Sequence, residues 1–446
     1  MDIPPLLLAR AQFLASFSFL ALFMAVSLAL AWLLLFFKVR ARLSGQPGWT
    51  AAYRFWVRVF ALCFVLALAA AVPVLIQLGS LWGGLMDRIG NVAGPLVGFG
   101  VLSVFVLKSC FLGVMLFGQR RVSDTAHTLA VLMVAVGQLL AVGWVVALHS
   151  WMQTPDGAAL IEGRYQVYDW VAVVFNPSFG WSLTLTVLGA AQAVAFLMLG
   201  VTALQALRRP TDDGERCAFR AALAVAFVAT MLQAPAAAGM AELMGRYQPA
   251  KAAAVAGYWH SGETPRLVLA GLPDPAQQRN RGAVSIAGGG WWLGRDAQGG
   301  YLGLDKFSGM QPPVALVFWT ARAAVLLGVL MLLASAFTLL RLRGRGLDPA
   351  ALPSWWLRGL VGMTFAGGLG VVASWWTSLL GLLPFAVNRS VTQTEIVGPA
   401  AASTLGYGLA GYLALYAVLC VAFAAMVLHA ARYGVVPVRK AAGGTP

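Results

Sequence analysis

Residues 11–37 read AQFLASFSFLALFMAVSLALAWLLLFF and contain no charged side chain. A helix needs about 20 mostly apolar residues to cross the hydrocarbon core of a bilayer, so this stretch is long enough to span it. It is also too long for the apolar core of a cleaved signal peptide, which holds about 7–15 residues. The sequence therefore predicts a transmembrane helix near the N-terminus.

Eight further stretches have the same character. Hydrophobic residues make up 60% of the 446 residues and charged residues only 11%, whereas soluble domains carry about 25% charged residues. A lone chain in lipid must pair its backbone groups internally, and the alternation typical of barrel strands is missing. We therefore expect an all-α integral membrane protein with nine transmembrane helices. The predicted spans are 11–37, 55–83, 94–118, 126–153, 179–207, 218–243, 314–340, 354–385 and 404–431.

Basic residues gather in alternate connections. The segments after the first, third, fifth and seventh spans and the C-terminal tail carry clusters of Lys and Arg, while the short intervening loops are nearly neutral. Because basic loops stay in the cytoplasm, we expect the N-terminus outside and the C-terminus inside a bacterial-type plasma membrane. The net charge of +15 then reflects topology and contact with membrane lipid, and no nucleic-acid partner is expected.

One connection is long and polar. Residues 244–313 are rich in Gly and Pro and lie on the predicted outer side, and loops of this length are usually functional or disordered. We divide the chain into a six-helix region (1–243), this outer loop (244–313) and a three-helix region with a cytoplasmic tail (314–446).

Few groups inside the spans can do chemistry. No Asp or Glu lies in the central part of any span, which leaves no visible proton path, and Lys108 is the one midplane charge. An intramembrane charge is costly and marks a functional candidate, although a lysine can also snorkel or pair with a carbonyl. Arg322 lies near the outer start of the seventh span, and His149 near the outer end of the fourth. The scattered cysteines and histidines predict no disulfide framework and no metal site.

Several short motifs resemble subunit I of the cytochrome bd quinol oxidases. The likeness covers essentially the whole chain, including the nine spans and the long loop after the sixth. The motifs that carry it are Ala9-Arg10-Ala11-Gln12-Phe13, Phe55-Trp56, Trp151-Met152-Gln153-Thr154-Pro155, Asn176-Pro177, and Tyr247-Gln248-Pro249-Ala250-Lys251-Ala252-Ala253 in the outer loop.

The resemblance implies oxidation of quinol at the outer loop and reduction of oxygen to water, with two b haems, one d haem and a second membrane subunit. It implies that Lys251 binds the quinone headgroup and that Arg322 and Arg389 are arginines retained from the family. The family's other working residues are replaced: the haem ligands fall at Leu20, Leu185, Ala324 and Ala386, the loop glutamate falls at Ala256, and a glutamate of the third span becomes Lys108.

These residues leave three possible functions. The first is a haem-poor or haem-free paralogue of subunit I, without catalytic residues of its own. It would act by association with a second membrane subunit or a related oxidase or electron-transfer complex, with residual quinone binding at Lys251. In it, larger side chains such as Leu20 and Leu185 should fill the space of the missing haems. The second is an active oxidase with haem b or haem d held by displaced ligands, with His149 as the candidate haem ligand. The third is a transporter, for which no inverted repeat is evident.

Overall fold

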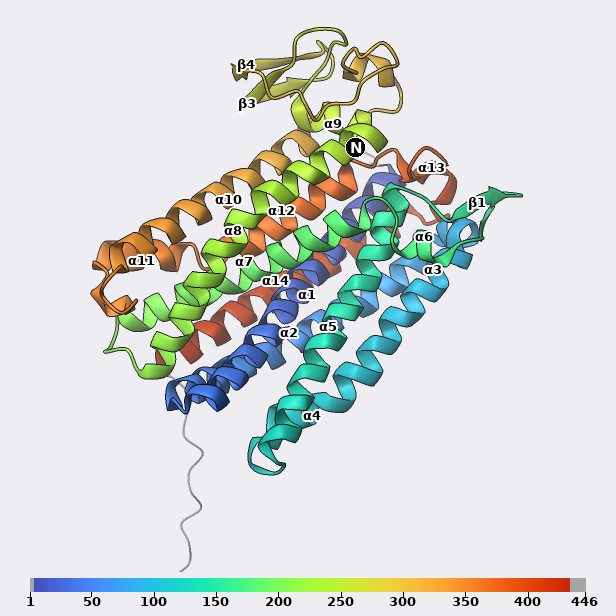
Figure 1. Cartoon of the computed structure of the whole chain (residues 1–446). Helices are drawn as coiled ribbons and strands as arrows, with labels where there is room; N and C mark the ends of the chain where they lie inside the picture. The colour runs from blue at the N-terminus through green and yellow to red at the C-terminus, as the bar shows by residue number, and fades with distance from the viewer. Residues whose placement is uncertain (1–3, 434–446) are drawn as a thin grey trace, which may run out of the picture.

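Nine long apolar helical segments run through residues 4–433, the part of the chain that the computed structural model describes (Figure 1). The predicted all-α membrane fold with nine spans is confirmed. The spans are formed by α1 (Pro5–Ser44), α2 (Pro47–Ser80), α3 (Gly83–Ser103) with η1 (Val104–Ser109), α4 (Cys110–Phe117) and η2 (Gly118–Arg120), α5 (Asp124–Gln153), α6 (Trp170–Val174) with α7 (Phe179–Ala206), α8 (Asp213–Tyr247), α10 (Val314–Leu342), α11 (Ser354–Gly362) with α12 (Ala366–Leu380), and α14 (Ala402–Tyr433).

Most helices extend past the apolar stretches that predict them. The first begins at Pro5 and ends at Ser44, where Gly45 takes a left-handed conformation with φ of 67° and closes the C-terminus. Left-handed glycine is a common helix stop because it lacks a Cβ. The extra turns carry Arg10, Lys38 and Arg42, side chains whose charged heads reach the membrane surface while their stems stay on the helix.

Three of the spans are irregular. In the fifth, residues 175–178 separate α6 from α7. In the third, η1 is a π-helical segment that carries Lys108, with Ser109 Oγ bonded to the carbonyl of Val104 five residues back. In the eighth, residues 363–365 separate α11 from α12. Insertions of the π type occur often at functional positions, so Lys108 lies on a backbone that departs from the regular helix.

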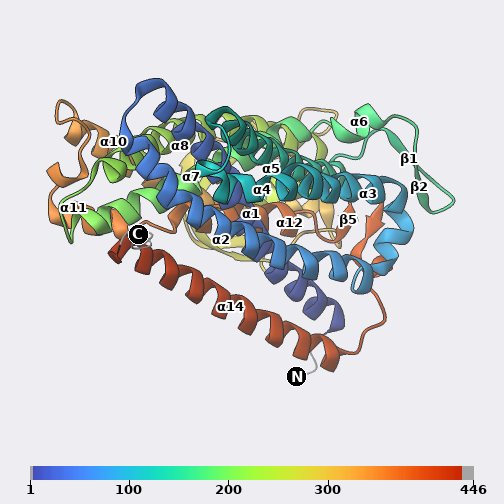
Figure 2. The ribbon, with the colours of Figure 1, turned by 90° about the horizontal axis from the view of Figure 1, so that it is seen from below.

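The core of the bundle is built around α1 and α7, which are the most buried spans, while the third span and α14 are peripheral. Figure 2 shows α14 at the edge of the bundle and α1 inside it. Small residues allow α7 to touch the eighth span: a Cβ on Gly367 of α12 would stand 2.5 Å from Ala193 Cα, and one on Gly200 would stand 2.0 Å from Oγ1 of Thr364, which lies between α11 and α12. Such close approach is the usual basis of helix packing in lipid.

One end of the bundle carries most of the remaining structure (Figure 1). The long loop forms α9 (Pro249–Ala256), an antiparallel hairpin of β3 (Arg266–Asp274) and β4 (Arg279–Ala287), and η3 (Leu304–Phe307). Two smaller hairpins pair β1 (Ala158–Ile161) with β2 (Arg164–Val167) and β5 (Phe385–Val387) with β6 (Val391–Thr392); η4 (Pro349–Ala351) and α13 (Gln393–Ile396) complete the described elements.

The N-terminal end of α1 lies at the same end of the bundle as α9 and the long loop, and the C-terminal end of α14 lies at the opposite end (Figure 1). At that opposite end Lys38 of α1 forms an ion pair with Asp124 of α5. This relative arrangement agrees with the expected topology. The assignment of either end to the cytoplasm remains a prediction, as does the division into three regions.

Candidate functional site

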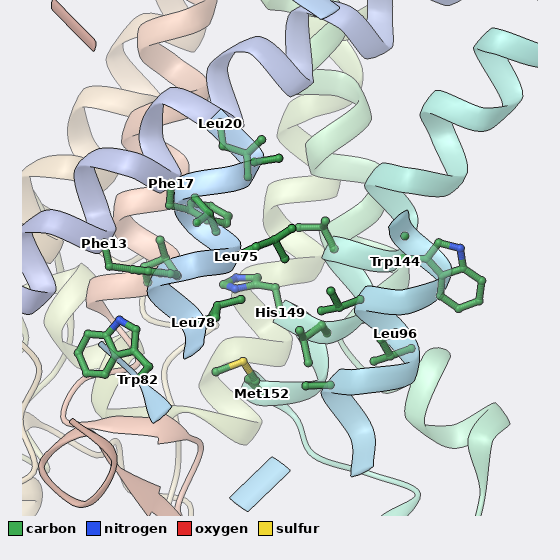
Figure 3. A pocket seen from close by; sticks show the side chains of 18 of the residues that line it. Phe13, Phe17, Leu20, Leu75, Leu78, Trp82, Leu96, Trp144, His149 and Met152 are labelled. Atoms are coloured by element: carbon green, nitrogen blue, oxygen red, sulfur yellow. The ribbon is translucent and has the colours of Figure 1, made fainter. Parts of the chain in front are cut away.

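Two cavities lie between the helices. The first has a volume of about 310 Å³ and is enclosed by α1, α2, α3, η1 and α5, with residues 379–396 at its outer end. Its walls are largely aromatic and aliphatic, as Figure 3 shows for Phe13, Phe17, Trp82 and Trp144. Volumes of this size are typical of small-molecule sites.

The second cavity has a volume of about 490 Å³ and lies among α5, α7, α8, α10 and α12, beneath α9. Its outer end is polar and its body is apolar. Two of its lining residues on α10, Val325 and Val329, are also strongly exposed on the surface of the bundle. The second cavity therefore opens sideways towards the bilayer.

The four positions where the family has haem ligands are divided between the two cavities. Leu20 and Ala386 line the first, and Leu185 and Ala324 line the second. The expectation that larger side chains close this space is wrong, since Leu20 and Leu185 border open volume instead of filling it.

His149 of α5 lines both cavities. Its ring meets Trp375 edge-on, with centroids 4.7 Å apart, and its Nε2 lies 2.9 Å from both Ser378 Oγ and Gln153 Nε2. Because an amide nitrogen only donates, Gln153 donates to His149 Nε2, and the ring proton belongs on Nδ1. The Nε2 lone pair of His149 is therefore already engaged by the protein.

Lys251 of α9 sets the orientation of that amide. Its Nζ donates to Gln153 Oε1 at 2.7 Å and to the backbone carbonyl of Ser378 at 3.3 Å. Its stem passes over Gly381, where a Cβ would stand 2.7 Å from Lys251 Cγ. The side chain is only 7% exposed, so Lys251 reaches inward to the second cavity instead of facing water in the outer loop. Its expected role with a quinone headgroup remains a prediction.

Lys108 points into the first cavity. It is 6% exposed, its Nζ lies 4.9 Å from the ring centroid of Phe64, and it forms no hydrogen bond or ion pair with the described residues. Neither snorkelling to the surface nor pairing with a carbonyl describes this lysine. The midplane charge expected from the sequence is thus a buried amine facing apolar walls.

The two retained arginines and Ala256 line neither cavity. Arg322 of α10 donates to the carbonyls of Val255 and Val268 at 2.8 and 2.6 Å, so it fastens α9 and β3 to the bundle. Arg389 is exposed at the turn between β5 and β6, with φ of 59°. Ala256 is buried under the loop, in a cluster with Tyr258 and Leu293.

Sequence reasoning missed the polar partners of these groups. Gln153 stood inside a quoted motif without a role, and Gln138 and Ser378 were not singled out. Their signal is an uncharged polar residue within an otherwise apolar span, which in lipid needs a partner. What brings His149 and Ser378 together is tertiary packing of α5 against α12, which no local pattern reveals.

The residues of the two cavities fit an iron porphyrin poorly. Axial ligands come from His, Met, Cys thiolate or Tyr side chains, whereas the four corresponding positions hold Leu and Ala, and His149 Nε2 is engaged by Gln153. No Asp or Glu lines either cavity, and no group of three or more His, Cys, Asp or Glu gathers anywhere in residues 4–433. None of the four family ligand positions therefore offers a donor to iron. The thioether sulfurs that line the cavities belong to methionines at other positions, namely Met24, Met86 and Met152 in the first and Met240, Met244 and Met331 in the second.

The fold defines a multi-pass membrane protein with two cavities between its helices. The sequence model of the cytochrome bd terminal oxidase subunit I family matches residues 8–435. The chain therefore belongs to the cytochrome bd oxidase subunit I family, a family of respiratory quinol oxidases of bacterial membranes whose members bind haem.

Individual relatives are distant. Cytochrome bd ubiquinol oxidase subunit 1 of Bacillus subtilis is 24% identical over 93% of this chain and 91% of its own length. Cytochrome bd-II ubiquinol oxidase subunit 1 of Escherichia coli is 26% identical over 63% of this chain and 55% of its own length. The bd oxidase of Geobacillus thermodenitrificans superposes with a TM-score of 0.88 over 97% of this chain and 100% of that one, at 19% identity. The fold is thus shared although most side chains differ.

The buried amine of Lys251 makes the free energy of unfolding depend on pH. Burial lowers the pKa of Lys251 to about 7 from 10.5. Between these values the unfolded chain binds more protons than the folded one, so stability rises with pH. From pH 7 to 9 we expect wild type to gain about 2 kcal/mol relative to Lys251→Met. Thermal unfolding in detergent measures this gain, with the exposed Lys306→Met as control. Parallel pH profiles for wild type and Lys251→Met would contradict it.

Proposed function

We propose that this chain is a haem-poor subunit I paralogue that serves a structural or assembly role in a membrane complex. The observation that carries the proposal is the side chains at the four ligand positions: Leu20 and Ala386 in the first cavity, and Leu185 and Ala324 in the second. None of them has an atom that can donate electrons to iron. The family's frame is kept while its catalytic donors are lost.

The outer loop around α9, where the family resemblance places quinol oxidation, supports the same proposal. Lys251 is already bonded to Gln153 and Ser378, and Ala256 stands where the family has a carboxylate. A general base within reach of a quinol hydroxyl is needed to take its proton, and the alanine offers none. Residual quinone binding near Lys251 is compatible with this role, and oxidation of the quinol would need a base other than the carboxylate that Ala256 replaces.

An active oxidase with displaced ligands is the second candidate, and His149 is the residue that favours it because it lines both cavities. To bind iron through Nε2, His149 would have to release Gln153. The amide of Gln153 is in turn held by Lys251. Two buried side chains, Gln153 and Lys251, would therefore have to rearrange for one ligand, which makes this candidate the weaker one.

A pyridine haemochrome assay decides between the two. The chain is produced without other oxidase subunits, purified in mild detergent and checked for helical content by circular dichroism. We expect well under about 0.1 haem per folded chain, since Leu and Ala cannot ligate iron. Near-stoichiometric haem, lost on His149→Ala substitution, would overturn the proposal in favour of the displaced-ligand oxidase.

The association itself is tested on native membranes. The chain is extracted with an affinity tag, and its co-purifying proteins are identified by mass spectrometry. We expect a second multi-pass subunit in near-equal amount, because a chain without donors of its own needs a partner to take part in electron transfer. Recovery of this chain alone, under conditions that keep a known two-subunit oxidase intact, would contradict the structural role.

A further inference from the structure

The deep end of the first cavity has two polar groups that the proposed function does not use. Lys108 Nζ is a donor without a partner among the described residues, and Gln138 Oε1 is a buried acceptor without one. Both residues line the same cavity. An unpaired buried donor or acceptor costs stability, so a matching ligand would be bound strongly here.

Lys108 is directed inward by its surroundings. Its stem packs against α5 at Gly137, where a Cβ would stand 3.0 Å from Lys108 Cγ and 2.6 Å from Leu107 Cβ. Its amine lies over the ring of Phe64 on α2. The π-helical segment η1 and a glycine in the facing helix thus give this side chain a place between helices and not on the lipid face.

The orientation of Gln138 is fixed as well. Its Nε2 donates to Ser27 Oγ at 2.7 Å, while Ser27 Oγ donates to the carbonyl of Met24 at 3.1 Å. Because the serine proton is committed to that carbonyl, the amide cannot flip without losing its bond. Gln138 therefore leaves its oxygen as a buried acceptor in the cavity that Lys108 also lines.

The cavity is long and narrow and opens towards lipid. Its lining runs from Arg10 to Met24 on α1, a rise of about 21 Å, against about 15 Å for half of the hydrocarbon core. Leu68 and Leu75 of α2 and Val101 of α3 line it and are also exposed on the bundle surface. A bilayer-dissolved molecule can therefore enter sideways, between α2 and α3.

We propose that the first cavity binds a long-chain carboxylic acid whose carboxyl group lies between Lys108 and Gln138. One carboxyl oxygen accepts from the Lys108 amine, and the O–H of the protonated acid donates to Gln138 Oε1. The acid and the lysine together are neutral whichever of them holds that proton, which removes the cost of an isolated charge at membrane depth. The alkyl chain runs along Phe17, Leu75 and Trp82 towards the outer end of the cavity (Figure 3).

A carboxylate from a partner's helix would be the other source of a negative charge. Such a helix would pack on the outside of α2 and α3, whereas Lys108 lies between Phe64 and Gly137 and faces the inner cavity. The slot is lined by side chains along its whole length and suits a single chain better than a helix, which is about 10–12 Å wide. The geometry therefore favours a lipid acid.

Photolabelling tests the site directly. The purified chain in phosphatidylcholine nanodiscs is exposed to a 16-carbon fatty acid with a mid-chain diazirine, and the labelled peptides are mapped by mass spectrometry. We expect label on α2 and α3 around Leu75 and Leu96, competed by palmitic acid and not by its methyl ester. Lys108→Met should weaken labelling at least about tenfold, and Gln138→Leu should weaken it to a smaller extent.

Matched variants keep the test decisive. Lys108→Met removes a buried amine and keeps an apolar stem, so it should fold, and Lys108→Arg should retain labelling. Lys306→Met, at an exposed lysine that lines neither cavity, should leave the label unchanged. Equal labelling of wild type and Lys108→Met, or label confined to α7 and α10, would overturn the proposal. The proposal would also be overturned if Lys108→Met kept normal labelling but no longer co-purified with a second subunit. Lys108 would then pair with a group of that subunit and not with a lipid acid.

Discussion

A chain carrying Leu185→His together with Ala324→Met should bind haem b, at close to one per molecule, where the unmodified chain binds little or none. Both positions line the second cavity, whose volume is about 490 Å³. The substitutions restore the histidine and the methionine that the family resemblance places there, and His with Met is a common axial pair. The measurement is the pyridine haemochrome of the purified double variant, together with its reduced-minus-oxidised spectrum.

The single variants are the controls for this gain. Leu185→His alone offers one ligand and should bind haem more weakly, while Ala324→Met alone should remain pale. Leu185→Met with Ala324→Leu fills the cavity without a nitrogen donor and should also remain pale. If the double variant folds, keeps its helical content and still binds no haem, the loss of the two ligands at Leu185 and Ala324 does not by itself account for a second cavity without haem, and the proposal loses its main support.

Arg322→Met should release the outer loop from the bundle. The guanidinium holds the carbonyls of Val255 and Val268 and lies 3.1 Å from the ring centroid of Phe318. Its loss leaves two partly buried carbonyls without partners and detaches β3 from α10. We expect a loss of about 3 kcal/mol and proteolysis within residues 257–313 that is at least about tenfold faster, with the spans intact. Limited proteolysis followed by mass spectrometry measures both effects.

Arg281 supplies the matched control. It pairs with Asp274 inside the same hairpin, with more than half of its side chain exposed, and exposed ion pairs contribute little. Arg281→Met should therefore be cut at the wild-type rate. If Arg281→Met and Arg322→Met accelerate cleavage equally, the hydrogen bonds of Arg322 do not hold the outer loop on the bundle.

The spans were predictable because the length of an apolar run is a local property. Residues 11–37 alone predict a membrane helix, and α1 contains all of them. The true ends at Pro5 and Ser44 were missed since charged residues can continue a helix beyond the hydrocarbon core. The π-helical turn at Lys108 was missed as well, because it arises from how η1 packs and not from its composition.

The site was predictable only in part. Lys108, His149 and Lys251 stood out as polar groups at unusual positions, and all three line a cavity. Their partners did not stand out, since Gln153 and Ser378 are separated by 225 residues and meet only in the folded bundle. The two cavities could not be predicted from the sequence. Open volume depends on how far apart the helix backbones lie, and a single leucine does not determine that distance.

The most direct measurement is a density map of the native chain at a resolution that shows side chains. We expect both cavities to lack any flat, iron-centred density, with Leu20, Leu185, Ala324 and Ala386 resolved at their edges. In the first cavity we expect a thin, chain-like feature that ends at Lys108. A porphyrin in either cavity with His149 turned onto its iron would contradict the central claim that this chain keeps an oxidase frame without the groups that hold haem.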